Sequence, residues 1–244
     1  MGEHRISVVI PALNEEACLA RAIRSVATDA EVIVVDGSSC DRTREIAETE
    51  GVAVLSCPPS RGAQLAAGAR LATGDWLVFL HADTWLEAGW ADDIRRLKPE
   101  AVGGAFRLAI EGPGRGYRLV EATVALRCRL FALPFGDQGL FVRRTVYDRM
   151  GGIAALPLME DVDFVRRLKG EGRLTLAPRR AFTSPRRWQR HGLVGATLRN
   201  WGLLGLYTAG VSPASPACRA PPRDEAGRRQ SPFSRWSAAS TRNR

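Results

Sequence analysis

Short apolar runs alternate with stretches of helical spacing in the first hundred residues. The runs cover residues 6–10, 31–35, 52–55 and 76–80. Each run predicts a strand, and the run of residues 76–80, bounded by polar residues, predicts a strand buried on both faces. Pro11 predicts the end of the first strand. The helix-like stretches cover residues 19–26, 41–50, 61–71 and 87–97. Strands that alternate with helices in this way predict βαβ units and a parallel sheet.

Polar residues follow three of these predicted strands where each strand ends. They are Asn14 and Glu15 after the first, Asp36 after the second, and Asp83 after the fourth. Because parallel strands share one carboxyl end, we expect these groups at one edge of the sheet, where open α/β sheets bind ligands. Ordinary polar loops are the alternative, since every strand must leave the core. For Asp83, the alternative is an N-cap for a helix that begins near Glu87.

The second half has a less regular pattern. It predicts strands over residues 102–110 and 140–142 and a helix over residues 117–133. Within the first of these strands, Gly103 and Gly104 indicate a close approach of another backbone. Glu160 and Asp161 precede apolar positions spaced for one helix face. They therefore lie at a helix N-terminus, which favours carboxylates and is a sufficient structural reason for them.

Residues 193–211 are apolar but glycine-rich and interrupted by charge, so they are too polar for a membrane span. Trp201 and Leu204 with flanking arginines suit a helix on a membrane surface, and packing against the rest of the chain is the alternative. Residues 212–244 are rich in Pro, Ser, Ala and Arg, which predicts a disordered basic tail.

The net charge is +9, of which residues 212–244 carry +5, from seven Arg against one Asp and one Glu. Such a balance suits a phosphorylated substrate or an anionic membrane, whereas no nucleic-acid motif is visible and we expect no nucleic-acid partner. The five cysteines are scattered, without a Cys-x-x-Cys pair, and no N-terminal signal is visible. We therefore expect a cytoplasmic protein without a zinc site. A location at the inner face of the membrane is the alternative.

Three motifs in order carry a resemblance to a known family. They read Val-Ile-Pro-x-x-Asn-Glu-Glu from residue 9, Val-Val-Asp-Gly-Ser-Ser-Cys-Asp-Arg-Thr from residue 34, and Gly-Asp-Trp-Leu-Val-Phe-Leu-His-Ala-Asp from residue 74. Over about residues 6–211 the chain resembles the family 2 glycosyltransferases of the GT-A fold. It is most similar to a small bacterial branch with Phe-Leu-His-Ala-Asp-Thr, Gly-Asp-Gln-Gly and Pro-Leu-Met-Glu-Asp.

The resemblance implies an α/β fold of the GT-A, Rossmann-like type, with a mostly parallel sheet flanked by helices. We expect a single catalytic domain over residues 1–192. Its nucleotide-binding half would be residues 1–98 and its acceptor half residues 99–192. An amphipathic C-terminal helix over residues 193–211 and the tail over residues 212–244 would follow.

The resemblance also implies site residues in the first half. The metal-binding pair would be Asp83, as the last acid of an Asp-x-Asp motif, and His81. The nucleotide pocket would be lined by Pro11, Asn14, Glu15, Asp36, Arg61, Gln64 and Ala82. Two positions depart from the family pattern: His81 replaces the first acid, and Gly37 stands where many members have an aspartate. Losing a carboxylate weakens a hard-cation site, and an imidazole tolerates Mn²⁺ better than Mg²⁺, so we expect Mn²⁺ to be preferred. The alternative is an enzyme that depends little on a metal ion.

In the second half, Asp161 matches the residue that supplies the family's catalytic base, with Glu160 as the second choice. The pair Asp137 and Gln138 resembles the acceptor-side loop, for which a plain turn is the alternative. Arg187 and Trp188 match the end of the family's Gln-x-x-Arg-Trp, whose Gln position is Ser184 here, so a polymerising enzyme is not expected. Arg187 would close over the departing diphosphate, and a solvated basic face is the alternative.

Together these features predict an inverting glycosyltransferase that moves a sugar from a UDP- or GDP-sugar to a hydroxyl acceptor. A divalent metal at Asp83 would neutralise the leaving diphosphate, and Asp161 would take the acceptor's proton. A lipid-linked acceptor and a small soluble one both stay open. The alternatives are a sugar-1-phosphate nucleotidyltransferase, whose Gly-x-Gly-x-Arg motif is missing, and a non-catalytic nucleotide-sugar-binding module, suggested by His81 and Gly37.

Overall fold

The computed structural model describes residues 4–156 and 159–192, together with Gly195, Gly202 and Gly205. The predictions for residues 193–211 and 212–244 otherwise lie outside these residues. The described strands are β1 (Ile6–Ala12), β2 (Glu31–Asp36), β3 (Ala53–Ser56), β4 (Trp76–Phe79), β5 (Thr84–Leu86), β6 (Ala101–Ile110), β7 (Leu140–Arg143) and β8 (Arg173–Thr183). The described helices are α1 (Leu19–Arg24), α2 (Thr43–Thr49), α3 (Arg61–Leu71), α4 (Trp90–Arg95), α5 (Arg115–Phe131), the 3₁₀ turn η1 (Gly136–Gln138), α6 (Arg144–Arg149), α7 (Glu160–Glu171) and α8 (Arg186–His191).

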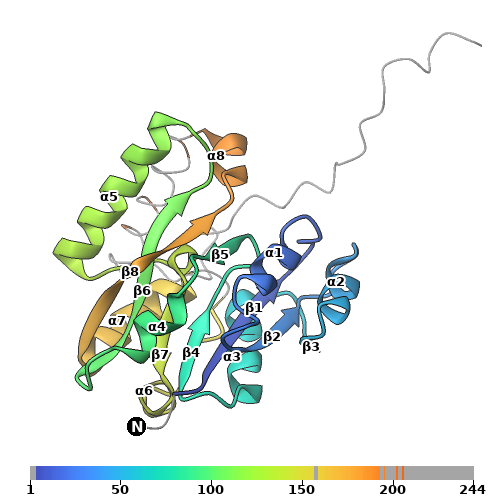
Figure 1. Cartoon of the computed structure of the whole chain (residues 1–244), viewed down its shortest axis with the longest axis horizontal. Coiled ribbons are helices and arrows are strands. Elements are labelled where there is room, and N and C mark those ends of the chain that lie inside the picture. The colour runs from blue at the N-terminus through green and yellow to red at the C-terminus, as the bar shows by residue number, and fades with distance from the viewer. Residues whose placement is uncertain (1–3, 157–158, 193–194, 196–201, 203–204, 206–244) are drawn as a thin grey trace, which may run out of the picture.

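Within these residues, eight strands form one sheet in the order β3-β2-β1-β4-β7-β6-β8-β5 (Figure 1). The first four are parallel to one another, as the βαβ pattern predicts. β7 is antiparallel to both of its neighbours, β6 is parallel to β8, and β5 is antiparallel to β8. The predicted α/β fold with a mostly parallel sheet and flanking helices is confirmed.

The expectation that Pro11 ends the first strand is wrong, because β1 continues to Ala12. The carbonyl of Val9 accepts a hydrogen bond from Leu80 and therefore points toward β4. Groups two residues apart on a strand point to the same side, so the nitrogen of Pro11 also faces β4. The pairing of β1 with β4 ends at Val9, so the missing N–H of Pro11 costs no ladder hydrogen bond.

Asp83 does not cap a helix near Glu87, so that alternative is also wrong. The residues after Asp83 form β5, which pairs with the end of β8. The helix begins only at Trp90, after Gly89 in a left-handed conformation with φ of 81°. A three-residue strand is stabilised by its partner strand, and here that partner lies almost a hundred residues further along the chain.

The pattern of apolar and polar residues in the sequence also failed to predict α6 and β8. β8 carries arginines on its exposed positions, and Ala177 and Ala181 are its buried apolar residues, so its alternation is hard to see. The expected close approach at Gly104 is confirmed. A Cβ there would lie 1.8 Å from the carbonyl oxygen of Thr175 on β8.

Helices cover both faces of the sheet and bury two apolar layers. α1, α2 and α4 contribute Leu19, Ala47 and Trp90 to one layer. On the opposite face, α3, α6 and α7 pack their apolar residues against the alternate positions of the same strands. The core therefore fixes the carboxyl ends of β1, β2 and β4 at one edge.

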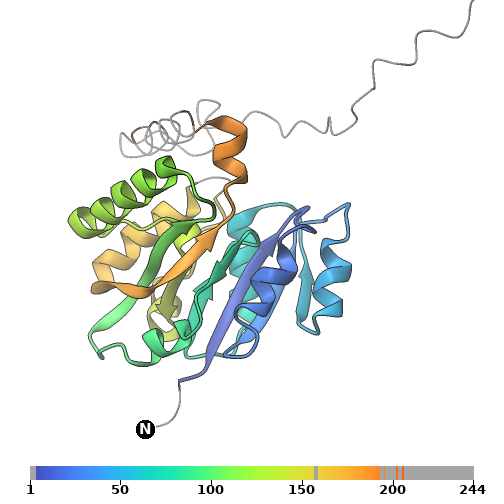
Figure 2. The same cartoon turned by 45° about the horizontal axis from the view of Figure 1, so that its top comes forward.

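A third apolar cluster joins α5, α8 and β6. Trp188 of α8 is 6% exposed and packs with Leu108 and Ile110, and its ring lies 6.4 Å from that of Tyr117 at the start of α5. α8 follows the end of β8 directly and stands beside α5 (Figure 2). Among the described helices, none combines the length and the apolar character that a membrane crossing requires.

Candidate functional site

The loops after β1 and β2 hold each other through polar side chains. The Asn14 Oδ1 atom accepts a hydrogen bond from the Cys40 N–H at 2.8 Å, and the Asn14 N–H donates to Ser39 Oγ at 2.9 Å. Asp36, which is 4% exposed, accepts the N–H of Ser39 with both carboxylate oxygens, at 3.2 and 3.3 Å. Asn14 and Ser38 have positive φ values of 55° and 68°. The two loops therefore form a closely connected polar edge.

The side chain of Gln64 on α3 binds to the backbone of the same polar edge. Its side-chain amide donates to the carbonyls of Ala12 and Val35 at 2.9 and 2.7 Å, and the residue is 4% exposed. A Cβ at Gly37 would lie 3.0 Å from this amide nitrogen and 3.3 Å from the Ala12 oxygen. The glycine at a position where many family members have aspartate thus has a physical reason, since Gln64 occupies the space.

The acidic residues after β1 and β4 meet at a guanidinium from α8. Arg186 Nη2 lies 2.6 Å from Glu15 Oε2 and 4.0 Å from Asp83 Oδ2. Burial works against the charge of Arg186, but its hydrogen bond to Glu15 and that carboxylate's charge raise its pKa above the ordinary value. The Ser184 N–H donates to the Asp83 carbonyl, so the residue after β8 is tied to the residue before β5. The predicted gathering of polar groups at one edge is confirmed.

His81 and Asp161 approach each other across Gly136. The Gly136 N–H donates to Asp161 Oδ2 at 2.8 Å. A Cβ at Gly136 would lie 2.8 Å from His81 Nε2 and 3.1 Å from Asp161 Oδ2. The other carboxylate oxygen of Asp161 accepts the N–H of Val162 at 2.9 Å. The glycine therefore allows an imidazole and a carboxylate from different halves of the chain to come together.

Glu160 is held differently from its neighbour Asp161. It is 1% exposed and forms a hydrogen-bonded ion pair with Arg61 at the start of α3. Burial, with the adjacent charge of Asp161, raises the pKa of the Glu160 carboxyl, while Arg61 acts in the opposite direction. Burial also opposes the charge of Arg61, yet the carboxylates of Glu160, Asp161 and Asp137 raise the pKa of its guanidinium.

Asp137 and Gln138 lie in η1, between Gly136 and β7, and both are buried. Gln138 donates to the Phe106 carbonyl at 3.1 Å and accepts from Arg127 Nη2 at 3.3 Å. The loop is therefore fixed to β6 and α5. Ala82, 4% exposed, packs in the core between His81 and Asp83. Arg187 belongs to α8, but its side chain lies outside the described part of the structure.

The described residues bring no group of three or more His, Cys, Asp or Glu side chains together as a metal site. Asp83 faces the guanidinium of Arg186, and His81 Nε2 lies toward Gly136 and Asp161. A hard divalent cation prefers several oxygen ligands, so these side chains do not by themselves fit one. The predicted Mn²⁺ or Mg²⁺ site stays a prediction, and no chemical step below depends on it.

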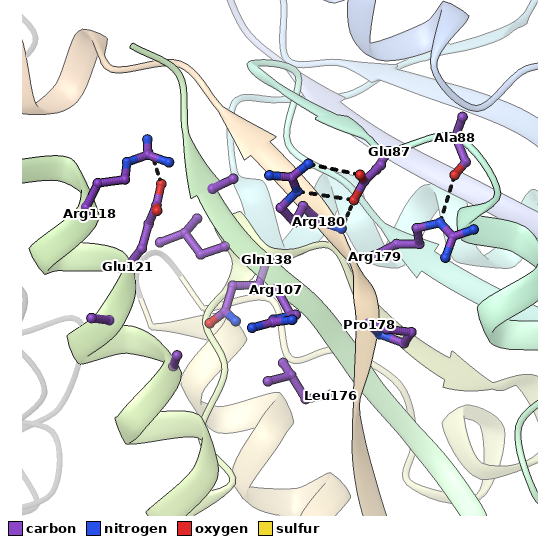
Figure 3. Close-up of a pocket in the computed structure, with 14 residues that line it drawn as sticks. Glu87, Ala88, Arg107, Arg118, Glu121, Gln138, Leu176, Pro178, Arg179 and Arg180 are labelled. Carbon is purple, nitrogen blue, oxygen red and sulfur yellow. Dashed lines mark hydrogen bonds and ion pairs between the residues drawn. The ribbon is translucent and has the colours of Figure 1, made fainter. Parts of the chain in front are cut away.

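An open groove of about 850 Å³ lies next to η1, between α5, β6 and β8 (Figure 3). Arg180 pairs with Glu87, and Arg118 pairs with Glu121. Arg107, at the centre of the groove, forms no ion pair or hydrogen bond through its side chain within the described residues. Sequence reasoning did not single out these arginines: Arg180 lies in a strand that it did not predict, and Arg107 and Arg118 lie in a predicted strand and a predicted helix without belonging to any motif. The lining residues are Glu87, Ala88, Arg107, Leu108, Ala109, Arg118, Glu121, Ala122, Ala125, Gln138, Leu176, Pro178, Arg179 and Arg180.

Solved structures share this fold. A mannosyltransferase from Pyrobaculum calidifontis, in complex with GDP-Man and Mn²⁺, superposes with a TM-score of 0.59 at 16% identity. The match covers 83% of this chain and 65% of that one. Glucosyl-3-phosphoglycerate synthase from Mycobacterium tuberculosis, with Mn²⁺ and UDP-glucose, superposes with a TM-score of 0.53 at 21% identity, over 85% and 80% of the two chains. These likenesses establish the GT-A fold.

Relatives and a family model agree with the fold. An uncharacterized glycosyltransferase from Rickettsia typhi is 30% identical over 172 residues, which are 67% of this chain and 56% of the relative. Another, from Mycobacterium bovis, is 32% identical over 106 residues, or 43% of this chain and 47% of the relative. The chain thus spans about half the length of the curated relatives it matches. The model of glycosyl transferase family 2 matches residues 7–153. Because this match covers more than half of the sequence, the chain belongs to glycosyl transferase family 2.

Proposed function

We propose that the protein transfers a sugar from a nucleotide-diphosphate donor to a hydroxyl acceptor, with inversion at the anomeric carbon. The observation that carries this proposal is the position of the Asp161 carboxylate beside His81, at the strand edge that also holds Asp83 and Glu15. A base and a polar nucleotide pocket at one edge are what direct displacement of a nucleoside diphosphate requires. Family membership supports the same reaction class.

Asp161 is the residue that we assign as the base. Its Oδ2 atom accepts the Gly136 N–H, and Oδ1 accepts the Val162 N–H, so the carboxylate is oriented by two backbone groups. A base must lie within hydrogen-bond reach of the acceptor hydroxyl whose proton it takes. Glu160, in contrast, is 1% exposed and paired with Arg61, which argues for a structural role.

The test replaces each carboxylate by its amide. Asp161→Asn should lower sugar transfer by at least about a hundredfold, the usual scale for losing a general base, while nucleotide binding is retained. Glu160→Gln is the matched control at the adjacent position and should retain measurable transfer. Transfer is followed with radiolabelled UDP- and GDP-sugars, and nucleotide binding by calorimetry. Full turnover by Asp161→Asn would contradict the assignment of Asp161 as the base. If the wild type binds a nucleotide but transfers sugar to no acceptor, a non-catalytic binding module is favoured instead.

The donor that we propose is a UDP- or GDP-sugar. The neighbours with the same fold are complexes with GDP-Man and with UDP-glucose, each with Mn²⁺. In this chain the pocket would be formed by the loops after β1 and β2, where Asp36 and Asn14 are rigidly held.

We further propose that the acceptor is amphiphilic and reached from an anionic membrane surface at the inner face of the membrane. α5 exposes Leu119, Leu126 and Leu130, at 68%, 56% and 63% of their surface. These positions share one helix face. Arg115 lies on that face one turn before Leu119, and Arg129, the residue before Leu130, lies at the edge of the stripe. An apolar stripe flanked by arginines suits an anionic bilayer. The groove with Arg107 opens beside this stripe and offers a place for an anionic head group.

Co-sedimentation with lipid vesicles tests this surface. The full chain should bind vesicles that contain phosphatidylglycerol more strongly than neutral ones. Changing Leu119, Leu126 and Leu130 together to Ser should weaken that binding by about tenfold or more, because each buried leucine contributes free energy on insertion. Leu71→Ser, a change at an exposed leucine on α3, is the matched control. Equal binding by the triple variant and the wild type would contradict the proposal.

A further inference from the structure

The groove between α5, β6 and β8 is largely separate from the polar strand edge (Figure 3). Of the predicted site residues that the structure describes, only Gln138 lines it. Its volume of about 850 Å³ is within the range of sites that bind small molecules. The side chains in its walls therefore indicate which kind of ligand it fits.

Two walls of the groove present apolar side chains. Ala122 and Ala125 lie on α5, Leu176 and Pro178 lie on β8, and all four are exposed. Because the two alanine side chains are short, the space between the helix and the strand stays open. Covering these side chains with an apolar chain would remove apolar surface from water, which is favourable.

Arg107 lies at the centre of the groove as an exposed cation (Figure 3). Its side chain forms no ion pair and no hydrogen bond within the described residues. The other three arginines of the lining each lie beside one acid. The pairs are Arg118 with Glu121, Arg180 with Glu87, and Arg179 with Asp93, at 2.9, 3.0 and 3.8 Å. Arg107 therefore supplies the uncompensated positive charge of the groove.

The register of β6 and β8 places Arg107 directly opposite Arg180. Arg180 is neutralised, because its Nε and Nη2 atoms lie 3.2 and 3.0 Å from the two carboxylate oxygens of Glu87. Like charges at opposite positions of paired strands destabilise a sheet. An anion at Arg107 would offset this repulsion. A guanidinium also matches two oxygens of one carboxylate or phosphate with parallel N–H groups.

We propose that the groove binds an acidic amphiphile, which is a single carboxylate or phosphate group on an apolar chain. The acidic group lies at Arg107, and the chain lies against Leu176 and Pro178. The groove borders η1, whose Gly136 N–H holds Asp161, so this ligand is taken to be the acceptor. In that respect the inference rests on the proposed function. It makes Arg107 the residue that selects acidic over neutral acceptors.

Calorimetry on the full chain tests the groove with octyl phosphate, octanoate, 1-octanol and inorganic phosphate. The wild type should bind the two amphiphilic anions at least about tenfold more tightly than the other two probes, which each lack one of the two contacts. Arg107→Gln should bind the anions about tenfold to a hundredfold more weakly and 1-octanol equally well. Arg173→Gln, at an exposed arginine of β8 outside the groove, is the matched control and should bind like the wild type.

A second variant closes the groove without changing its charge. Ala125→Phe places a large side chain at an exposed position of α5 that lines the groove. It should weaken the binding of octyl phosphate by about tenfold or more, because the space for the octyl chain is filled. Thermal melting of each variant checks that the fold is retained. Unchanged binding by a folded Ala125→Phe would show that the probe binds elsewhere and would overturn the inference.

The remaining outcomes separate the inference from the proposed function. Equal binding of octyl phosphate by Arg107→Gln and the wild type would overturn the role of Arg107. Inorganic phosphate or 1-octanol that binds as tightly as octyl phosphate would overturn the amphiphilic ligand. Wild-type binding of UDP or GDP without binding of either acidic probe would overturn the inference and leave the glycosyltransferase proposal standing. Arg107-dependent binding of an acidic probe, with no binding of UDP or GDP, would support the groove site and contradict the proposed donor.

Discussion

The two halves of the sheet hold their polar residues in different ways. In the half that contains β1 to β4, Asp36 accepts the N–H of Ser39, three residues away, and Asn14 holds the next loop. In the second half of the chain, the charged side chains of the candidate site depend on partners far along the chain. Glu160 pairs with Arg61, 99 positions away, and Arg186 reaches Glu15, 171 positions away.

One edge is therefore locally built, by loops that follow neighbouring strands, whereas the other is assembled from elements that are distant in the sequence. The loops after β1 and β2 rest on neighbouring parallel strands, and the structure of that edge follows from the strands themselves. The carboxylates of α7 take their positions only when α3 and the η1 loop pack against them. We therefore expect substitutions that disturb the packing of the second half to damage the site as a whole.

The largest expected effect is at Gly104, where β6 and β8 approach most closely. A Cβ would lie 1.8 Å from the Thr175 oxygen, so Gly104→Ala must move a backbone. We expect a loss on the order of 3 kcal/mol in the free energy of unfolding, measured by urea denaturation. Gly170→Ala in α7 is the control, since nothing lies within 4 Å of its Cβ, and it should be neutral or stabilising by up to about 1 kcal/mol. Equal effects of the two changes would contradict the close approach.

A smaller loss of stability is expected when the ion pair between Arg61 on α3 and Glu160 on α7 is removed. Arg61→Met leaves Glu160 buried without its cation and should cost about 1–3 kcal/mol, less than a fully buried pair because Arg61 is 36% exposed. Arg149→Met breaks an exposed pair with Glu171 and should cost under about 1 kcal/mol.

The loss in the free energy of unfolding caused by Arg61→Met should also depend on pH. The pKa of Glu160 is raised in the folded state, mainly by burial, so its contribution to stability is present below the unfolded pKa of about 4.3 and is lost as pH rises. Without Arg61 the charged carboxylate is even less favourable. The stability difference between variant and wild type should therefore be smallest near pH 4 and grow toward pH 8, and a pH-independent difference would contradict this account.

The smallest expected effect is at Pro11, in the locally built half. Its nitrogen faces the side of β1 where β4 has ended, so Pro11→Ala gains no ladder hydrogen bond and should change stability by no more than about 1 kcal/mol. Ile10→Ala, at the adjacent and fully buried position, should cost about 2–5 kcal/mol. A large loss at Pro11 would show that its ring, rather than its missing N–H, matters to the strand.

Much of the first half was predictable because it is regular. Apolar runs and helical spacing located β1 to β4 and α1 to α3, and the shared carboxyl end of parallel strands located Asn14, Asp36 and Asp83 at one edge. β5 and β8 were missed because each is stabilised by the other, over almost a hundred residues of sequence separation. The arginines of β8 also hide its few buried positions.

By itself, the sequence determined the order of the motifs, the family and the presence of carboxylates at strand and helix ends, since these follow from local patterns of apolar and polar residues. Only the tertiary structure decided which of them meet. It joined His81 with Asp161 across Gly136, buried Glu160 against Arg61, and set Arg186 between Glu15 and Asp83. The physical reason is that these contacts arise from the packing of distant elements, where side-chain burial and charge pairing depend on neighbours that no local pattern contains.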